Sequence, residues 1–382
     1  MPAELTVAEV VATIHQMYDP ARAEAWDAVG LVTGDPASPV RRVLLAVDPV
    51  QSVIDEAVAW GADLLVVHHP LLLNAVHSVA ATTPKGRAVH TLVRAGIALL
   101  VAHTNADAPV AGVSDAMAQA FGLVDPRPVE PAPAPSLDKL VVFVPHGDAA
   151  RVGEALTDAG AGRIGDYDRC TFSSTGIGAF APGPGAHPTV GVVGRLEQVP
   201  ETRLEMVVSR DRRAAVLDAL RSSHPYEEPA FDLLEMAELP GDSGHGRIGR
   251  LAVPSTLAAF CESVVSSLPA TRSVVRVLGD LERRVETVAL CGGSGDFLLD
   301  AVRRSGADAY VTSDLRHHPA SELAEHAAAP ALIDVPHWAA ESLWLPVVQA
   351  RLHSRLGPRG TTVESQVSRI VTDPWTSHLP MP

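Results

Sequence analysis

Short apolar runs alternate with segments of helical periodicity in the first third of the chain. Three of the runs predict buried strands, at residues 43–47, 62–67 and 97–102. Apolar residues recur at helical spacing in the segments around them, at residues 5–18, 51–60 and 88–95. Strands that alternate with helices in this way predict βαβ units and a largely parallel sheet.

The same rhythm returns in the last third of the chain. Strands are predicted at residues 285–290, 309–312 and 331–334. Helices are predicted at residues 256–267, 296–305, 319–328 and 339–356. The two ends of the chain therefore predict one α/β core.

The middle of the chain follows a different order. A strand at 140–144, a helix at 149–159, further strands, a second helix at 212–220 and a last strand near 231–236 predict a ferredoxin-like α+β domain of the split βαβ kind. A Pro-rich stretch that favours extended polyproline II precedes it, and the glycine-rich stretch 241–246 follows it as a return linker.

The predicted fold is therefore α/β, a core α/β domain built from both chain ends with an inserted ferredoxin-like α+β domain. The first half of the core spans 1–125 and is followed by a Pro-rich linker at 126–139. The inserted domain spans 140–240, the second half of the core 245–370, and a C-terminal tail 371–382.

Composition narrows the functional classes. The formal net charge is −15, which argues against a nucleic-acid surface because phosphate binding needs clustered Lys and Arg. No apolar stretch approaches the ~20 residues of a membrane helix, and no secretory signal is visible at the N-terminus. The three cysteines are odd in number and widely spaced, as in a reducing compartment, so we expect a cytoplasmic protein without a membrane partner.

Histidines and acids stand where the predicted strands end. His68 and His69 follow the run 62–67, and Asp107 comes four residues after His103, which follows the run 97–102. Ligand sites of α/β sheets form outside the carboxyl ends of strands, so these groups can meet. Adjacent side chains of a strand point to opposite faces, so His68 and His69 suit two neighbouring ions, or one ligand and one supporting group. A solvated strand end is the alternative.

His337 and Glu341 add a third set of candidate ligands. Their i, i+4 spacing places both side chains on one helix face if Pro336 starts the helix, and Glu341 is then able to bridge two ions. Such a pair also occurs by chance on solvated helices. The pair gains weight because it follows another predicted strand, at 331–334.

Other polar residues are candidates for supporting or substrate-facing roles. Thr104 and Asn105 are expected to hold Asp107 by hydrogen bonds. The remaining candidates of this kind are His103, His317 and His318, with surface placement as the alternative for the last two. Backbone N–H groups in Gly292-Gly293-Ser294-Gly295, between a strand and a helix, are candidates for anion binding, with a tight turn as the alternative.

Nitrogen and oxygen ligands without cysteine suit Zn, Mn, Fe or Ni. Two such ions ~3.5–4 Å apart activate water and clamp the attacking and leaving oxygens, so metal-assisted hydrolysis is the natural chemistry. A purely structural site is the alternative, although structural sites are usually closed four-coordinate cages.

These residues together resemble the Nif-three-like family, whose members are often labelled GTP cyclohydrolase I type 2 homologues. The resemblance covers most of the chain and rests on four motifs: Trp26-Asp27-Ala28-Val29-Gly30-Leu31 with Gly34-Asp35, His68-His69-Pro70-Leu71, His103-Thr104-Asn105-Ala106-Asp107-Ala108, and His337-x3-Glu341. The segment 225–232 also looks like one found in members with an inserted domain. Asp334-Val335-Pro336-His337 departs from the common Asp-x-Gly-His, although the ligand spacing is kept.

The resemblance implies a dinuclear metal centre and a ring-shaped homohexamer. The residues that match the family's ligand positions are His68, His69, Asp107, His337 and Glu341. The expected function is a metal-dependent hydrolase of a small anionic or cyclic substrate, such as a nucleotide. The alternative is a non-catalytic hexamer that binds a metal or a metabolite and regulates through the inserted domain.

Overall fold

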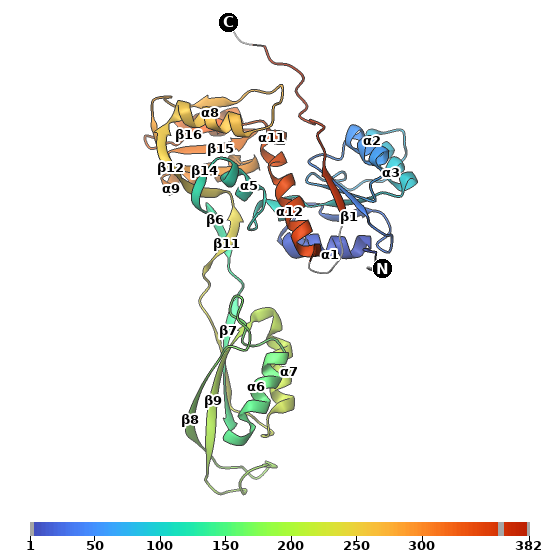
Figure 1. The fold of residues 1–382 in the computed structure, drawn as a ribbon. Helices are drawn as coiled ribbons and strands as arrows, with labels where there is room; N and C mark the ends of the chain where they lie inside the picture. Colours follow the sequence, from blue (N-terminus) through green and yellow to red (C-terminus); the bar gives the residue numbers. More distant parts are fainter. Residues whose placement is uncertain (1–3, 358–362, 380–382) are drawn as a thin grey trace. The chain divides into compact units, whose positions relative to one another are not determined.

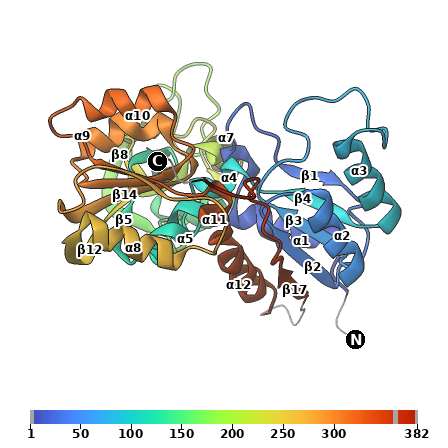
Figure 2. The ribbon, with the colours of Figure 1, turned by 90° about the horizontal axis from the view of Figure 1, so that it is seen from above.

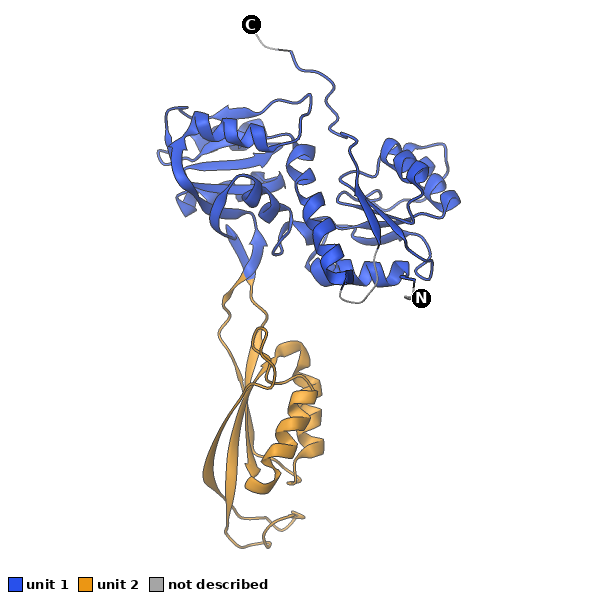
Figure 3. Ribbon diagram, in the orientation of Figure 1, with its two compact units in different colours: residues 1–132, 242–382 blue, residues 133–241 orange. Residues whose placement is uncertain are grey.

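The computed structural model describes residues 4–357 and 363–379. It divides into two compact units, residues 1–132 with 242–382 (unit 1) and residues 133–241 (unit 2), as Figure 3 shows. Residues 358–362 of the predicted second core half and 380–382 of the predicted tail lie outside the described residues. The α/β fold class is confirmed, and none of the described helices is long and apolar enough to cross a membrane.

The first sheet of unit 1 has the order β1-β4-β3-β2-β17 in the described residues. Its strands are β1 (Gly30–Thr33), β2 (Arg42–Ala46), β3 (Leu64–Val67), β4 (Ala98–Val101) and β17 (Glu364–Val367). All neighbouring pairs are parallel except β1 with β4. Because β3 and β4 are buried on both faces, their sequences are continuous apolar runs, which is why they could be recognised.

Several helices near this sheet come from the N-terminal region. They are α1 (Val7–Met17), the short 3-10 turn at Pro20–Arg22, α2 (Gln51–Trp60) and α3 (Pro84–Ala95). The side chain of Thr6 accepts a hydrogen bond from Glu9 N and the Glu9 carboxylate accepts one from Thr6 N, so a capping box begins α1.

The second sheet of unit 1 has the order β13-β16-β15-β14-β12-β5 in the described residues. Its strands are β5 (Leu123–Arg127), β12 (Arg247–Thr256), β13 (Arg276–Leu278), β14 (Arg284–Ser294), β15 (Ala309–Ser313) and β16 (Ala331–Asp334). Helices α4 (Thr104–Asp107), α5 (Val113–Ala120), α8 (Leu257–Ser267), α9 (Leu299–Ser305, after a 3-10 turn at Asp296–Leu298), α10 (His317–Ala324), α11 (His337–Ser342) and α12 (Trp344–Leu356) complete unit 1.

The two sheets share one apolar core. Buried residues of both sheets belong to a single cluster with residues of α1, α5, α8, α11 and α12. Figures 1 and 2 show α11 and α12 between the sheets, with α2 and α3 beside the first sheet and α9 beside the second. Fully buried Trp344 donates a hydrogen bond from Nε1 to the Tyr18 hydroxyl at 3.0 Å. This packing holds the carboxyl ends of β3, β4 and β16 near α11.

The predicted helix over 339–356 is two helices in the structure. α11 ends at Ser342 and α12 begins at Trp344. Pro346 has no N–H to donate, and its ring clashes with the carbonyl four residues earlier, that of Ser342. The break therefore falls where proline requires it, and it separates the ligand-bearing turn from the long core helix.

The stretches predicted as linkers contain strands. β5 and β6 (Glu130–Pro133) occupy much of the Pro-rich stretch, and β11 (Pro240–His245) covers the glycine-rich one. β5 is the last strand of its sheet, and β6 pairs with β11 in a two-stranded ribbon. Edge strands tolerate proline because one side of the strand needs no ladder donor. The polyproline interpretation was wrong for these residues.

Unit 2 is a ferredoxin-like α+β fold. Its elements follow as β7 (Leu137–Pro145), α6 (Ala149–Asp158), β8 (Thr171–Phe180), β9 (Glu197–Ser209), α7 (Arg213–Ser223) and β10 (Phe231–Glu235), with short 3-10 turns at His146–Asp148 and Arg210–Arg212. The antiparallel sheet has the order β10-β7-β9-β8. Buried residues of both helices and of β7 and β9 form the core of unit 2.

Candidate metal centre

The structure brings the five sequence-predicted ligands together in unit 1. His68 and His69 follow the end of β3, and Asp107 is the last residue of α4, just after β4. His337 is the first residue of α11 and Glu341 lies one turn later. The His68 and His69 ring centroids are 5.1 Å apart, and those of His69 and His337 are 5.2 Å apart.

The Glu341 carboxylate is the centre of the group. It is buried, with 2% of the residue exposed. Its Oε1 lies 2.8 Å from His337 Nε2 and 3.5 Å from His68 Nε2, and its Oε2 lies 2.9 Å from His69 Nε2. His68 Nε2 is also 3.5 Å from Asp107 Oδ1. Both oxygens of Glu341 thus face imidazole nitrogens, the arrangement expected of a bridging carboxylate.

His68 and His69 both face this centre although strand alternation separates neighbours. The two residues lie in a bend beyond β3, where His68 N donates to the carbonyls of Ala46 and Val47, and His69 N to that of Val47. The alternation rule holds only for extended strands, so it does not apply to this pair.

Four histidines of the site are held in the same way. In each, Nδ1 donates to an oxygen that only accepts, so Nε2 is the nitrogen that remains available to a ligand. The bonds are His68 to the Ala102 carbonyl at 2.9 Å, His69 to Asp48 at 2.7 Å, His103 to Asp27 at 2.8 Å and His337 to Asp314 at 2.6 Å.

Buried polar atoms at the centre lack hydrogen-bond partners. Among the described residues these atoms include His68 Nε2, Asp107 Oδ1, His337 Nε2 and Glu341 Oε2. Buried polar atoms rarely lack hydrogen bonds, because burying a polar group without one costs free energy of folding. Two groups, His68-His69-His103 and His69-His337-Glu341, have ligand atoms within 4.8 Å of one another. The nitrogen and oxygen donors, and the buried atoms without hydrogen-bond partners, fit the binding of divalent cations.

The charges at the centre are strongly coupled. Burial alone lowers the pKa of an imidazole, but the Glu341 charge and hydrogen bonds to carboxylates outweigh it, raising the pKa of His69 to about 10 and that of His337 to about 11. Burial alone raises the pKa of Glu341, yet the three imidazoles hold it well below its usual value. The centre therefore requires positive charge beside Glu341.

Asp107 is not held by its neighbours in the way the sequence suggested. Asn105 Nδ2 donates to the Tyr18 carbonyl at 2.8 Å, and the Thr104 hydroxyl donates to Asp27. The expectation that Thr104 and Asn105 fix Asp107 was therefore wrong, because their side chains donate to Asp27 and to the Tyr18 carbonyl instead. Burial raises the pKa of the Asp107 carboxyl to about 6.

The structure places the remaining candidates differently. His103 lies beside His68, with ring centroids 5.2 Å apart, and belongs to one of the two possible metal-binding groups. His317 and His318 are exposed at the start of α10, with their rings packed against each other and outside both groups.

Two supporting carboxylates were not among the predicted site residues. Asp48 follows the end of β2, and Asp27 lies in the loop before β1. Asp48 obeys the same strand-end rule that revealed His68, so the rule could have found it. Asp27 stands in the motif 26–31, but its role depends on its contacts with His103 and Thr104, which no spacing reveals.

The stretch Gly292-Gly293-Ser294-Gly295 borders the same centre. Residues 292–294 are the end of β14 and not a loop between strand and helix. Residues 291–294 line a cavity of about 570 Å³ together with Asp107, His337 and Glu341. Gly293 has a φ of +66°, and a Cβ there would lie 3.0 Å from Glu341 Oε1. A glycine at this position leaves room for the carboxylate.

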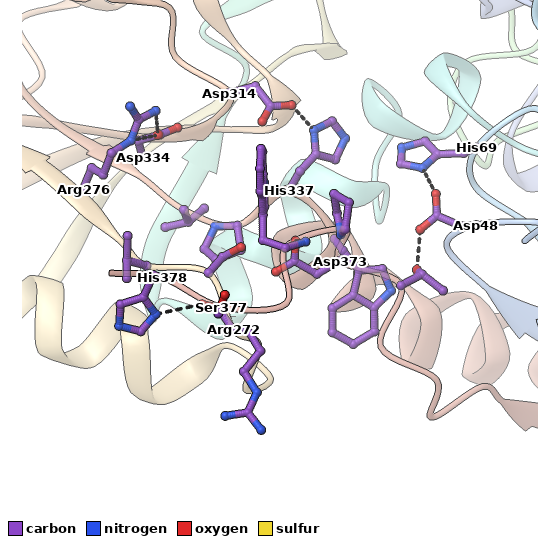
Figure 4. A pocket seen from close by; sticks show the side chains of 18 of the residues that line it. Asp48, His69, Arg272, Arg276, Asp314, Asp334, His337, Asp373, Ser377 and His378 are labelled. Carbon is purple, nitrogen blue, oxygen red and sulfur yellow. Dashed lines mark hydrogen bonds and ion pairs between the residues drawn. The ribbon is translucent and has the colours of Figure 1, made fainter. Parts of the chain in front are cut away.

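A second cavity of about 720 Å³ lies on another side of the centre (Figure 4). Its walls include His69, His337 and their partners Asp48 and Asp314, together with residues of the segment 372–378. Since His337 lines both cavities, each of them reaches the candidate ligands.

Comparison with known proteins shows similarity along almost the whole chain. The family described as Duf34/NIF3 (NGG1p interacting factor 3) matches residues 5–374. A Mycobacterium leprae protein named GTP cyclohydrolase 1 type 2 homolog is 48% identical over 370 residues, covering 97% of this chain and 94% of the relative.

Solved structures agree with this. The crystal structure of a Bacillus cereus protein related to NIF3 has a TM-score of 0.81 and 34% identity, covering 98% of this chain and 99% of that one. The Staphylococcus aureus protein SA1388 has a TM-score of 0.83 and 25% identity, with the same coverage. The inserted unit is therefore shared with solved relatives.

Proposed function

Because the chain belongs to the Duf34/NIF3 family, we propose that it binds two divalent cations and acts as a metal-dependent hydrolase on a small anionic or cyclic substrate, such as a nucleotide. The observation that carries the proposal is the set of imidazoles whose Nδ1 atoms are all held by acceptors while buried Nε2 atoms gather around Glu341. The name of the relatives, GTP cyclohydrolase 1 type 2 homolog, favours hydrolysis of a ring.

The candidate ligands would have the following roles. The residues that would hold the cations are His68, His69, Asp107, His337 and Glu341, and Glu341 would offer both of its carboxylate oxygens. When bound, such cations act as Lewis acids and activate water near neutral pH. The donor set of nitrogen and oxygen suits Zn, Mn, Fe or Ni.

The cavity of about 570 Å³ is the proposed substrate site. It is large enough for a small molecule and is lined by both Asp107 and Glu341. Backbone N–H groups of residues 292–295 would bind an anionic group of the substrate. Trp26 and Phe297, which are both exposed and line the cavity, offer apolar surface to a ring.

The test is metal content and turnover measured on one preparation. Elemental analysis should give two ions per chain, and protein loaded with each metal should hydrolyse at least one member of a panel of cyclic amides, phosphoesters and nucleotides. The double variant His68→Ala/Glu341→Ala should lose both ions and the activity. Absence of turnover with every metal across the panel, in protein that holds two ions, would remove the hydrolase proposal and leave the metal centre.

The second candidate is a non-catalytic, homohexameric binder of a metal or metabolite that regulates through unit 2. It is favoured by the placement of both possible metal-binding groups of the described residues in unit 1, while unit 2 is a separate compact unit. Metal-dependent turnover that survives deletion of residues 137–238 would favour the enzyme. Light scattering would test the hexamer, and a cytoplasmic location stays a prediction.

A further inference from the structure

The chain after β17 runs from the first sheet of unit 1 to the second. Ser368 N donates to the Leu45 carbonyl at 2.8 Å, which keeps the segment beside β2. Further on, the Thr372 hydroxyl donates to Asp48 Oδ2, and His378 Nδ1 donates to the Arg272 carbonyl at 3.0 Å, close to β13 (Figure 4). Residues 372–375, 377 and 378 form part of the wall of the cavity of about 720 Å³.

Asp48 connects this segment to the metal centre. Its Oδ1 accepts a hydrogen bond from His69 Nδ1 at 2.7 Å, while its Oδ2 accepts one from the Thr372 hydroxyl. His69 Nε2 in turn lies 2.9 Å from Glu341 Oε2. A carboxylate bonded through one oxygen can still rotate, whereas bonds to both oxygens fix its plane and thereby the imidazole that it holds.

We propose that Thr372 is a positioning residue of the metal centre, whose hydroxyl orients Asp48 so that Asp48 presents His69 to a bound cation. The C-terminal segment is then a working part of the centre as well as a wall of its cavity. The inference rests on the metal-binding part of the proposed function and does not depend on hydrolysis.

The expected effect follows from the removal of one hydrogen bond. Thr372→Val keeps the shape of the side chain but leaves Asp48 Oδ2 without its donor, an unfavourable state for a half-buried carboxylate. Partners that orient metal ligands typically contribute 10–100-fold to metal affinity. Since Thr372 acts through Asp48, we expect the lower end of that range, about a 10-fold loss.

The experiment measures Zn²⁺ and Co²⁺ affinity of the full chain by competition with a chromophoric chelator. Thr372→Val should weaken binding about 10-fold and change the Co²⁺ absorption spectrum, because the ligand geometry changes. Thr372→Ser, which restores the hydroxyl, should recover both. Ser377→Ala is the matched control on the same segment and the same cavity, and it should behave as the wild type.

A double-mutant cycle separates positioning from a general loosening of the segment. In an Asp48→Ala background, Thr372→Val should cause no further loss of affinity, because the orienting contact is already absent. An equal loss in both backgrounds would assign Thr372 a purely structural role and overturn the inference. Unchanged affinity and spectrum of Thr372→Val would also overturn it, whereas a wild type that binds neither ion would refute the metal centre itself.

Discussion

Each unit of the molecule contains a buried carboxylate, and the two are stabilised differently. Asp138 in unit 2 has no exposed side-chain surface, and its oxygens accept two bonds from the Arg213 guanidinium, at 2.8 and 2.9 Å. Glu341 in unit 1 faces imidazoles. Among the described residues, Glu341 Oε2, His68 Nε2 and His337 Nε2 lack hydrogen-bond partners. Unit 2 neutralises its buried charge with its own residues, whereas unit 1 leaves its buried charge incompletely matched.

The pKa directions agree with this difference. Hydrogen bonds from Arg213 lower the pKa of Asp138, and that pair is complete without a ligand. At Glu341 the balance depends on raised pKa values of His69 and His337, so protons occupy positions that a cation would take. The feature that distinguishes the candidate metal centre from Asp138 is buried charge without a full set of hydrogen-bond or ion-pair partners.

The largest effect is expected from Glu341→Gln, which removes the central charge and keeps the shape. Loss of a direct ligand should exceed the 10–100-fold effect of a supporting residue, so we expect Zn²⁺ affinity to fall by more than about 100-fold. Elemental analysis and chelator competition measure it. Glu322→Gln, an exposed residue of α10, is the control, and full metal content in Glu341→Gln would contradict the central role.

Asp27→Asn tests whether the carboxylate that holds His103 contributes to metal binding. Asp27 accepts bonds from His103 Nδ1 at 2.8 Å and from Thr104 N at 3.0 Å, and an amide nitrogen there would face a donor. We expect about a 10-fold loss of metal affinity. The control is Asp35→Asn, whose carboxylate only caps a turn at Ala37. Equal affinities for wild type and Asp27→Asn would show that His103 has no part in the centre.

Arg213→Met removes the partner of the buried charge in unit 2. Asp138 then remains buried without its bidentate partner, so unit 2 should unfold several degrees earlier while the metal affinity of unit 1 stays unchanged. Hydrogen exchange in β7 and α7 of the full chain, followed with temperature, measures the first effect. Arg221→Met is the exposed control. A parallel loss of metal binding would show that the two units are energetically coupled.

The smallest effect concerns pH. Because the folded pKa of Asp138 is below its unfolded value of about 3.9, its contribution to stability is present above that value and is lost as pH falls through the folded pKa. Hydrogen exchange in β7 at pH 5 and pH 3, compared between wild type and Asp138→Asn, should show acid loosening in the wild type and a flatter response in the variant. The same response in both proteins would assign the loosening to other groups.

Much of unit 1 could be predicted because its central strands are buried on both faces. Such strands are continuous apolar runs, and the helix predicted at 51–60 has the bounds of α2. β17 was missed because three of its four residues are polar and its only pairing among the described residues is with β2, far away in the sequence. An edge strand of this kind depends on a distant partner and has no local pattern.

The candidate site was predictable to the extent that strand ends reveal it. His68, His69 and Asp107 follow strands, and His337 with Glu341 follow from helical spacing. The partners of these residues could not be inferred, because a hydrogen bond such as Asp48 to Thr372 joins segments at opposite ends of the chain. The role of Thr104 and Asn105 was misjudged for the same reason, since sequence neighbours need not be bonding partners.

The position of β17 has a consequence for how the protein is made. The first sheet is bounded on one side by β17, and the candidate ligands come from residues near both ends of the chain. Unit 2 is a single continuous segment with its own core. It can therefore fold during translation, before the second half of unit 1 has been synthesised. The first sheet of unit 1 is completed only when β17 is made, so a cation held by the candidate ligands would bind after unit 2 has been synthesised.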